Sequence, residues 1–479
     1  MKKLLALLSL LFIFGQSAFS QTRLCELEMY SKTFKIEKPN KIDQAINPST
    51  NEYCVFLRGS FSLDALLFNA DGTFRKKISM KPAFAYNNHL EGAFYDGVNY
   101  NAILKTNKKV TRIKFDFNAM EYKTEAWESN SKKRQHLSSF THNNVFYQLY
   151  VNKTTSEFSL ESTDQEKSFK TSHFSFLEHD FLANGKITPF YNAARRKGLN
   201  SFKCFENNLC LNPEDAIGSG KIYLIENEMK MVMDINNEVT TILTVDMNNM
   251  KTKIQEFAKN IPSSKKRWAD SNSYYLNGKL LQLYTFQRNL HVQIIDTKLD
   301  SIINTYELSA SDTAISWANI PATQSKIFSK EKKKTIKTVS STIKRINSAE
   351  IFIFATPDRT SNNILVSIGG ILYPQYNNNF GTMGTMGGMP GFGPNAESYY
   401  SNESLPVSNN FKGSIYYFQS LMDTNYQHVD KDITNVNTVK VMDYLSDMRK
   451  EKCSYFQRQN NFNTIHYLRK EKKLKIIQF

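Results

Sequence analysis

Residues 277–308, NGKLLQLYTFQRNLHVQIIDTKLDSIINTYEL, are the stretch that decides the fold. Their apolar, β-prone residues fall into three runs, at 280–286, 290–295 and 302–308. The polar segments 287–289 and 296–300 separate these runs. Short apolar runs that alternate at period two between polar breaks are typical of half-buried β-strands. The stretch therefore predicts a meander of three or four short strands.

The same pattern recurs along the chain at a regular interval. Residues 146–161, FYQLYVNKTTSEFSLE, repeat its order of apolar run, polar turn and apolar run, and weaker copies occupy 101–116 and 229–246. Residues 51–71 are a further candidate copy. If Asn69, Asp116, Glu161, Asp246 and Asp296 are equivalent strand ends, the intervals are 47, 45, 85 and 50 residues.

An interval of forty to fifty residues with several short strands per unit is the repeat signature of a β-propeller blade. Over residues 45–310 the sequence resembles, in this pattern alone, the propeller-like repeat proteins exported by Gram-negative bacteria. No blade signature such as a WD dipeptide recurs. The resemblance implies a mainly β fold with a propeller-like array of about six short meander blades. The alternative is a stack of meanders that forms a β-sandwich.

The intervals also predict how the chain is divided. Residues 1–20 form a signal peptide, 21–320 the β-repeat region, and 321–479 a C-terminal region that closes the fold. The long interval of 85 residues predicts an insertion near 183–217. In the C-terminal region, the apolar residues at 336, 339, 343 and 346 predict one amphipathic helix over 330–346. Strands are expected at 350–354, 363–368, 413–419, 439–442, 464–468 and 474–479.

The first twenty residues have the order of a secretory signal peptide. Lys2 and Lys3 precede an apolar run from Leu4 to Phe14, and small residues follow at Ala18 and Ser20. The run is shorter than the roughly 20 apolar residues that a membrane span needs. We expect export, cleavage after Ser20, and a mature protein without a transmembrane segment in the periplasm, at the outer membrane or outside the cell.

The basic charge of the chain narrows the range of partners. Without Lys2 and Lys3, 59 basic and 45 acidic residues leave a net charge of +14. A basic balance favours anionic partners, but dense runs occur only at 330–334 and 469–475. Because the charge is spread and the chain is exported, we expect no nucleic-acid binding and instead expect another envelope protein or a glycan as the partner.

The five cysteines permit disulfides in an oxidising compartment. Cys204 and Cys210, which close the short loop CFENNLC, are the preferred pair, and Cys25 with Cys54 is the next candidate. Zinc sites need Cys or His ligands at tight spacing, such as two CxxC pairs, and the sequence has none. We therefore expect no metal and no cofactor.

A glycine- and methionine-rich segment at 375–395 is predicted to be a flexible loop, because dense glycine cannot bury enough side chain to offset its backbone entropy. Three interpretations of this segment stay open. It is a plain disordered insertion, a copper(I) site built from thioethers, or a loop that contacts a partner. The residues that would make such a contact are Phe380, Met383, Met386, Met389 and Phe392.

Catalytic motifs are absent from the sequence. No HExxH, GxSxG or phosphate-binding loop occurs. Ser341 and Lys344 fit the SxxK pattern of serine acyl enzymes, but no SDN or KTG motif follows. Among the eight histidines, His136 with His142 and His173 with His179 are the close pairs, and only the second pair has carboxylates beside it in the sequence.

Two functions from different classes agree with these observations. The first is an exported, non-catalytic binding or scaffold protein of the bacterial envelope, which acts through protein or glycan contacts. The alternative is a glycan-acting hydrolase or lyase on a β-propeller. No catalytic, cofactor-binding or metal-binding residue is assigned, since fold alone does not settle function.

Overall fold

A computed structural model of the chain describes most of the sequence. The described residues are 22–29, 39–80, 89–106, 109–128, 133–163, 169–176, 181–183, 186–196, 202–205, 210, 212–236, 238–262, 269–326, 333–358, 361–373, 413–433, 436, 439, 442, 452–458 and 461–478. They form two compact units, one of residues 1–176 with 434–479 and one of residues 177–433.

The first unit contains four antiparallel sheets of four strands each among its described residues. Sheet 1 joins the two ends of the chain, from β1 (Thr22–Glu28), β30 (Lys452–Arg458), β31 (Asn461–Leu468) and β32 (Lys473–Gln478). Sheet 2 consists of β2 (Lys41–Ile46), β3 (Tyr53–Arg58), β4 (Leu63–Phe68) and β5 (Phe74–Met80). Sheet 3 consists of β6 (His89–Tyr95), β7 (Tyr100–Lys105), β8 (Lys109–Asp116) and β9 (Glu121–Glu128). Sheet 4 consists of β10 (Arg134–His142), β11 (Val145–Asn152), β12 (Phe158–Thr163) and β13 (Phe169–Phe174).

The second unit contains three sheets of four or five strands in its described part. Sheet 5 consists of β16 (Lys203–Phe205), β17 (Gly220–Ile225), β18 (Glu228–Met233), β19 (Val239–Asp246) and β20 (Thr252–Ala258). Sheet 6 consists of β21 (Asp270–Leu276), β22 (Lys279–Phe286), β23 (Asn289–Asp296) and β24 (Ser301–Ser309). Sheet 7 runs in the order β26 (Lys334–Thr335), β25 (Ile320–Lys326), β29 (Ser414–Met422), β28 (Ile364–Leu372) and β27 (Glu350–Pro357).

Between sheets 4 and 5 the chain forms a short hairpin and two small helices in place of a meander. These elements are β14 (Phe181–Ala183), β15 (Lys186–Thr188), α2 (Phe190–Arg196) and α3 (Pro213–Ala216). They fall in the long interval of the repeat, where an insertion is expected at 183–217.

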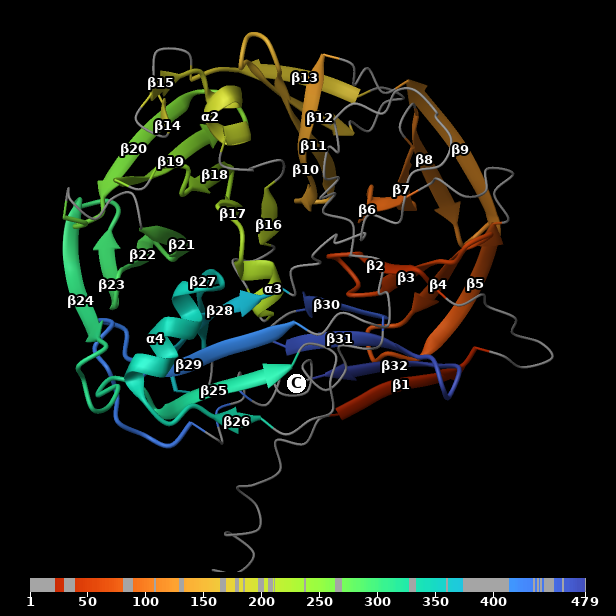
Figure 1. The fold of residues 1–479 in the computed structure, drawn as a ribbon. Coiled ribbons are helices and arrows are strands. Elements are labelled where there is room, and N and C mark those ends of the chain that lie inside the picture. Colours follow the sequence, from red (N-terminus) through yellow and green to blue (C-terminus); the bar gives the residue numbers. More distant parts are fainter. Residues whose placement is uncertain are drawn as a thin grey trace, which may run out of the picture. The chain divides into compact units, whose positions relative to one another are not determined.

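Within each unit, edge strands of neighbouring sheets contact one another. In the first unit β2 contacts β30 and β6, and β6 contacts β10 (Figure 1). In the second unit β21 contacts β27. We call β2, β6 and β10 the inner strands of the first unit. A succession of short meanders in contact through edge strands is the arrangement of propeller blades, so the predicted mainly β, propeller-like fold is confirmed.

The turns explain why the opening stretch folds as it does. Asn277 and Gly278 both have positive φ angles, 49° and 81°, as a two-residue type I′ hairpin turn between β21 and β22 requires. After β23, the Asp296 carboxylate accepts the backbone N–H groups of Lys298 and Leu299 at 2.9 and 3.1 Å. Such a side chain-to-backbone turn stops one strand and starts the next.

Apolar clusters fill the spaces between the sheets of the first unit. Ala45, Phe56, Leu90 and Ala102 belong to the cluster between sheets 2 and 3. Tyr53 and Ile476 belong to the cluster between sheets 1 and 2. The C-terminal strand β32 is therefore part of this core, and it pairs with β1 from Thr22–Gln478 to Glu28–Lys473, with a register shift between Arg23 and Cys25.

Two predictions in the C-terminal region were wrong in detail. The helix is α4 (Val339–Asn347) and starts nine residues later than predicted, because Thr338 caps it by accepting the Ser341 N–H at 3.2 Å and β26 pairs with β25 upstream. Val439 and Met442, predicted as a strand, have helical backbone.

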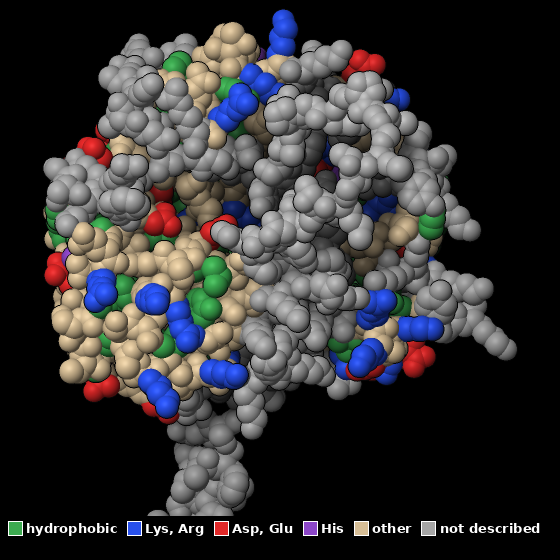
Figure 2. Space-filling model, viewed as in Figure 1, with side chains coloured by type: hydrophobic (Ala, Val, Ile, Leu, Met, Phe, Trp, Pro, Cys, Tyr) green, Lys and Arg blue, Asp and Glu red, His purple; other side chains and the backbone are tan. Residues whose placement is uncertain are grey.

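Lys and Arg side chains stand in several separate groups on the face shown in Figure 2. None of the helices in the described ranges combines the length and hydropathy of a membrane span.

Candidate functional site

A chain of three polar side chains links two inner strands of the first unit. On β10, the Ser139 hydroxyl donates to Oε2 of Glu91 on β6 at 2.8 Å. Nε2 of His136 lies 2.8 Å from the same hydroxyl oxygen. A hydroxyl has one proton to donate, and here the carboxylate receives it. His136 therefore donates its Nε2 proton to Ser139, and Glu91 is the acceptor at the end of the chain.

A bulge in β10 makes this contact possible. Residues three apart on a regular strand point to opposite faces of the sheet. The pairing of β10 with β11 shifts between His136 and Ser138, and one extra residue in a strand reverses the alternation. His136 and Ser139 are thereby brought to the same face, toward β6.

Two lysines and one histidine surround Glu91. Burial by itself would raise the pKa of the Glu91 carboxyl, but Lys105, His136, Lys41 and the bond from Ser139 hold it below its ordinary value. Lys41, on β2, donates from Nζ to the backbone oxygen of Leu90. We call Lys41, Glu91, Lys105, His136 and Ser139 the inner-strand array.

Burial lowers the pKa of two basic members of the array, His136 and Lys105. Burial, with the charge of Lys105, lowers the pKa of His136 to about 4, so its imidazole is neutral near pH 7. Burial also lowers the pKa of Lys105, and Glu91 and Glu161 oppose this shift. A buried ammonium that stays charged gains from every acceptor it can reach.

Lys105 has no such acceptor among the residues that the structure describes. Its Nζ lies 5.4 Å from the centre of the Tyr150 ring, and among the described residues its ammonium makes no hydrogen bond or ion pair. Arg134 covers the same ring at 4.5 Å, but its guanidinium is paired with Glu161 at 2.7 Å. Among the described residues, Lys105 is thus a half-buried donor beside the Tyr150 ring with no acceptor of its own.

A second carboxyl lies on the neighbouring strand. Asp43 shares a face of β2 with Lys41, since the two are two residues apart. Burial raises the pKa of Asp43 against the opposing effects of Lys41 and of the Gln44 N–H. Lys41 also acts on Glu91. This one lysine therefore interacts with two carboxyls, that of Asp43, whose pKa is raised, and that of Glu91, whose pKa is lowered.

The structure gives different outcomes for the cysteines. Cys204, on β16, and the buried Cys210 are not joined by a disulfide in the structure, and their pairing stays a prediction. Cys210 Sγ instead contacts the Asn212 oxygen at 3.3 Å. For the second candidate pair, Cys54 belongs to the core between sheets 2 and 3, whereas Cys25 packs against the core between sheets 1 and 2, and no disulfide joins them in the structure.

The predicted partner-contact loop lies outside the described residues, together with Phe380, Met383, Met386, Met389 and Phe392. Within the described segments, no group of three or more His, Cys, Asp or Glu side chains is placed to hold a metal ion.

Sequence reasoning missed the array because its members come from three repeats. His136 had no carboxylate beside it in the sequence, yet Glu91 reaches it through Ser139. The usable signal is the repeat interval, because residues about 48 positions apart occupy equivalent inner strands. Ser139 contacts Glu91 at a separation of 48, and Lys41 contacts Leu90 at 49.

Comparison with known proteins gives resemblance of shape only. No family model matches the sequence, and no curated protein matches it. Among solved structures, the Dos1 propeller is 9% identical over 97% of this chain and 96% of its own, with a TM-score of 0.38. The WD40 domain of SCAP from fission yeast is 9% identical over 96% and 89%, with a TM-score of 0.32. Apocarotenoid oxygenase from Synechocystis is 9% identical over 56% of this chain and 62% of its own, with a TM-score of 0.32. The propeller-like architecture described above rests on strand pairing and not on these likenesses.

Proposed function

We propose that the protein is an exported, non-catalytic binding protein of the bacterial envelope and that the inner-strand array holds an anionic glycan. The observation that carries this proposal is the ammonium of Lys105, which is half-buried, stands beside the Tyr150 ring and has no acceptor among the described residues. A carboxylate or sulfate of a glycan supplies such an acceptor.

The other members of the array support the same ligand class. Lys41, on β2, adds a second cation. The ionised Glu91 can accept hydrogen bonds from the hydroxyl groups of a sugar. The Tyr150 ring is itself buried and packed under Arg134, so it fixes the cations rather than stacking on the sugar. The basic net charge of the chain favours an acidic ligand over a neutral one.

The test is a comparison of Lys105→Met with Lys123→Met. Lys123 lies on the exposed strand β9 with its side chain 75% exposed, so it controls for the loss of one positive charge. Calorimetric titration with oligogalacturonate should give a Kd about 10- to 100-fold weaker for Lys105→Met, because a hydrogen bond to a charged group contributes about 1.5–3 kcal/mol. Lys123→Met should bind like the wild type. Equal loss in both variants, or no binding by the wild type, would contradict the proposal.

One observation favours the alternative, a glycan-acting hydrolase. Hydrolysis of a glycosidic bond uses a protonated carboxyl as the acid and an ionised carboxylate as base or nucleophile. Asp43 and Glu91 have pKa values shifted in those two directions, which is the usual basis for assigning such roles. If this function holds, the wild type releases reducing ends from an acidic glycan and Asp43→Asn does not. If neither protein releases them while the wild type binds, only the binding function remains.

A further inference from the structure

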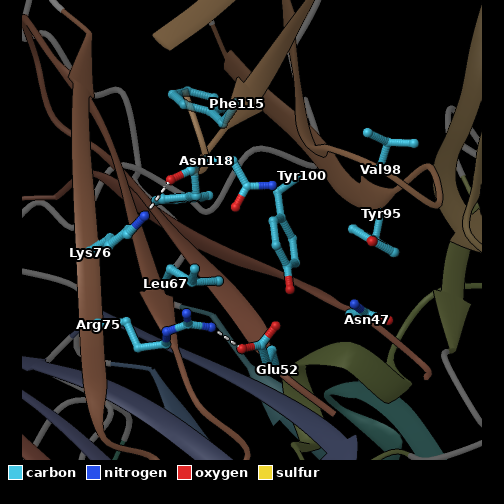
Figure 3. Close-up of a pocket in the computed structure, with 11 residues that line it drawn as sticks. Asn47, Glu52, Leu67, Arg75, Lys76, Tyr95, Val98, Tyr100, Phe115 and Asn118 are labelled. Carbon is cyan, nitrogen blue, oxygen red and sulfur yellow. Dashed lines mark hydrogen bonds and ion pairs between the residues drawn. The ribbon is translucent and has the colours of Figure 1, made fainter. Parts of the chain in front are cut away.

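A small cavity lies between sheets 2 and 3, within the first unit. Its volume is about 120 Å³, and its lining includes Asn47, Glu52, Arg75, Tyr95 and Tyr100 (Figure 3). Asn47 follows β2, whereas Lys41 of the array begins that strand. At about 3.3 Å per residue, six residues of strand separate them by roughly 20 Å. The cavity and the array are therefore two separate places on one interface.

The cavity contains a polar group whose hydrogen bond is not made. Tyr100 is 6% exposed, and its hydroxyl oxygen has no hydrogen-bond partner among the residues that the structure describes. Figure 3 shows this hydroxyl pointing into the space between Asn47 and Glu52. Burial raises the pKa of Tyr100, so the group keeps its proton and is a donor. A buried hydroxyl without a partner costs about 1–3 kcal/mol, and a ligand acceptor would remove that cost.

Aromatic rings form the walls around this donor. The ring centres of Tyr95 and Tyr100 are 4.8 Å apart at an interplanar angle of 46°. Phe117 meets Tyr100 edge-on at 5.9 Å, and Phe115 is fully buried behind them. Tyr95 is only half-buried, so part of its ring is available to a ligand. Val98, 76% exposed, stands at the rim.

The charged side chains of the cavity are paired with groups of the protein itself. Glu52 and Arg75 form an ion pair with each other, drawn in Figure 3. Lys76 donates from Nζ to the Phe117 backbone oxygen at 2.8 Å. A cation entering the cavity would meet Arg75 and Lys76, and an anion would meet Glu52. A neutral molecule can instead accept from the Tyr100 hydroxyl and donate to the Glu52 carboxylate.

We propose that this cavity, the Tyr100 pocket, binds one neutral pyranose ring. A sugar ring has an apolar face for the Tyr95 ring and hydroxyl groups that act as both donor and acceptor. The cavity is smaller than the roughly 300–1,000 Å³ of sites for drug-sized ligands, which limits the occupant to a single ring. This proposal is independent of the anionic glycan at the inner-strand array, and Lys105→Met leaves it unchanged.

The test uses Tyr100→Phe, which removes only the hydroxyl, and Tyr147→Phe as a matched control on β11 of sheet 4. Ligand-observed NMR titration with glucose, galactose, mannose and N-acetylglucosamine should show binding of at least one sugar to the wild type at millimolar concentration. Tyr100→Phe should weaken that binding by about 5- to 10-fold, the loss of one neutral hydrogen bond of about 1 kcal/mol. Tyr147→Phe should bind like the wild type.

A second measurement separates a ligand site from a cavity that holds only water. Water molecules that satisfied the Tyr100 hydroxyl would make it part of the fold, and Tyr100→Phe would then lower the Tm of the sugar-free protein. If the pocket is built for a ligand, the Tm of sugar-free Tyr100→Phe equals or exceeds that of the wild type. No sugar binding to the wild type, equal affinity in Tyr100→Phe, or galacturonate binding equally well in the pocket would overturn the proposal.

Discussion

The inner-strand array of the first unit and a polar network in the second unit are built from the same kinds of residue but differ in completeness. In the second unit, Asp234 Oδ1 accepts from Lys259 Nζ at 2.9 Å, from Thr240 Oγ1 at 2.8 Å and from Ser273 Oγ at 2.9 Å. Lys259 also donates to the Asn236 oxygen and the Ser271 hydroxyl, both at 2.8 Å. In the array, by contrast, the Lys105 ammonium has no such partner among the described residues.

Burial follows the same division. Asp234 and Lys259 are each 5% exposed, and the opposing charge of Lys259 holds the pKa of Asp234 down despite the burial that would raise it. Glu91, Lys105, His136 and Ser139 are only half-buried. A buried network with every donor and acceptor paired specifies the fold. A half-buried network that contains an unpaired donor is available to a ligand. This difference separates the structural network of the second unit from the candidate site in the first.

The largest expected effect is in the buried network. Asp234→Ala leaves the charge of Lys259 buried without its carboxylate, which should lower the free energy of unfolding by about 3–5 kcal/mol. Denaturant titration measures this loss, with Thr240→Val as a control that removes one neutral donor and should cost about 1 kcal/mol. A loss below that of the control would mean that Asp234 is not the centre of the network.

The next effect is the acid sensitivity that His136 contributes. Its pKa falls from 6.5 to about 4 on folding, so the unfolded chain binds a proton at pH values where the folded protein does not. Its contribution to stability is full above pH 6.5 and is lost as the pH falls toward 4, by at most about 3 kcal/mol. His136→Gln should flatten that part of the profile.

Unfolding measured from pH 7 to pH 4 checks this prediction. His466, whose pKa burial also lowers to about 4, contributes a similar slope that remains in His136→Gln. Identical slopes for wild type and His136→Gln would show that His136 is not held neutral by the array.

The smallest effect on stability is expected for Lys105→Met. An ammonium without an acceptor contributes little to the folded state, so the free energy of unfolding should change by less than about 1 kcal/mol. Lys259→Met should cost several times more, because it leaves Asp234 buried and unpaired. Equal losses in these two Lys→Met variants would erase the distinction between the two clusters.

The repeat was predictable from the sequence because it is written in strand and turn patterns. Asp116, Asp246 and Asp296 end β8, β19 and β23, and each occupies the same place in its meander. These aspartates accept backbone N–H groups in the turns that follow. A local requirement of this kind recurs wherever the turn recurs, so it appears as a period.

The site was not predictable by reading neighbours along the chain. Glu91 and Ser139 meet only because two inner strands pack together 48 residues apart, and His136 joins them only because β10 has a bulge. No residue type marks that bulge in the sequence. Among the described residues, Lys105 and Tyr100 have no hydrogen-bond partner because of what surrounds each group in space. A sequence pattern does not predict such a missing partner.

The most direct measurement is an NMR titration of the Lys105 ammonium in protein labelled with ¹³C-lysine, with Lys105→Met to assign its resonance. We predict a pKa below the ordinary lysine value in the free protein, as burial requires. We further predict that oligogalacturonate raises this pKa, because an acidic acceptor stabilises the charged form. An unshifted pKa in the free protein, or one that oligogalacturonate at saturation leaves unchanged, would contradict the claim that the inner-strand array is a binding site completed by its ligand.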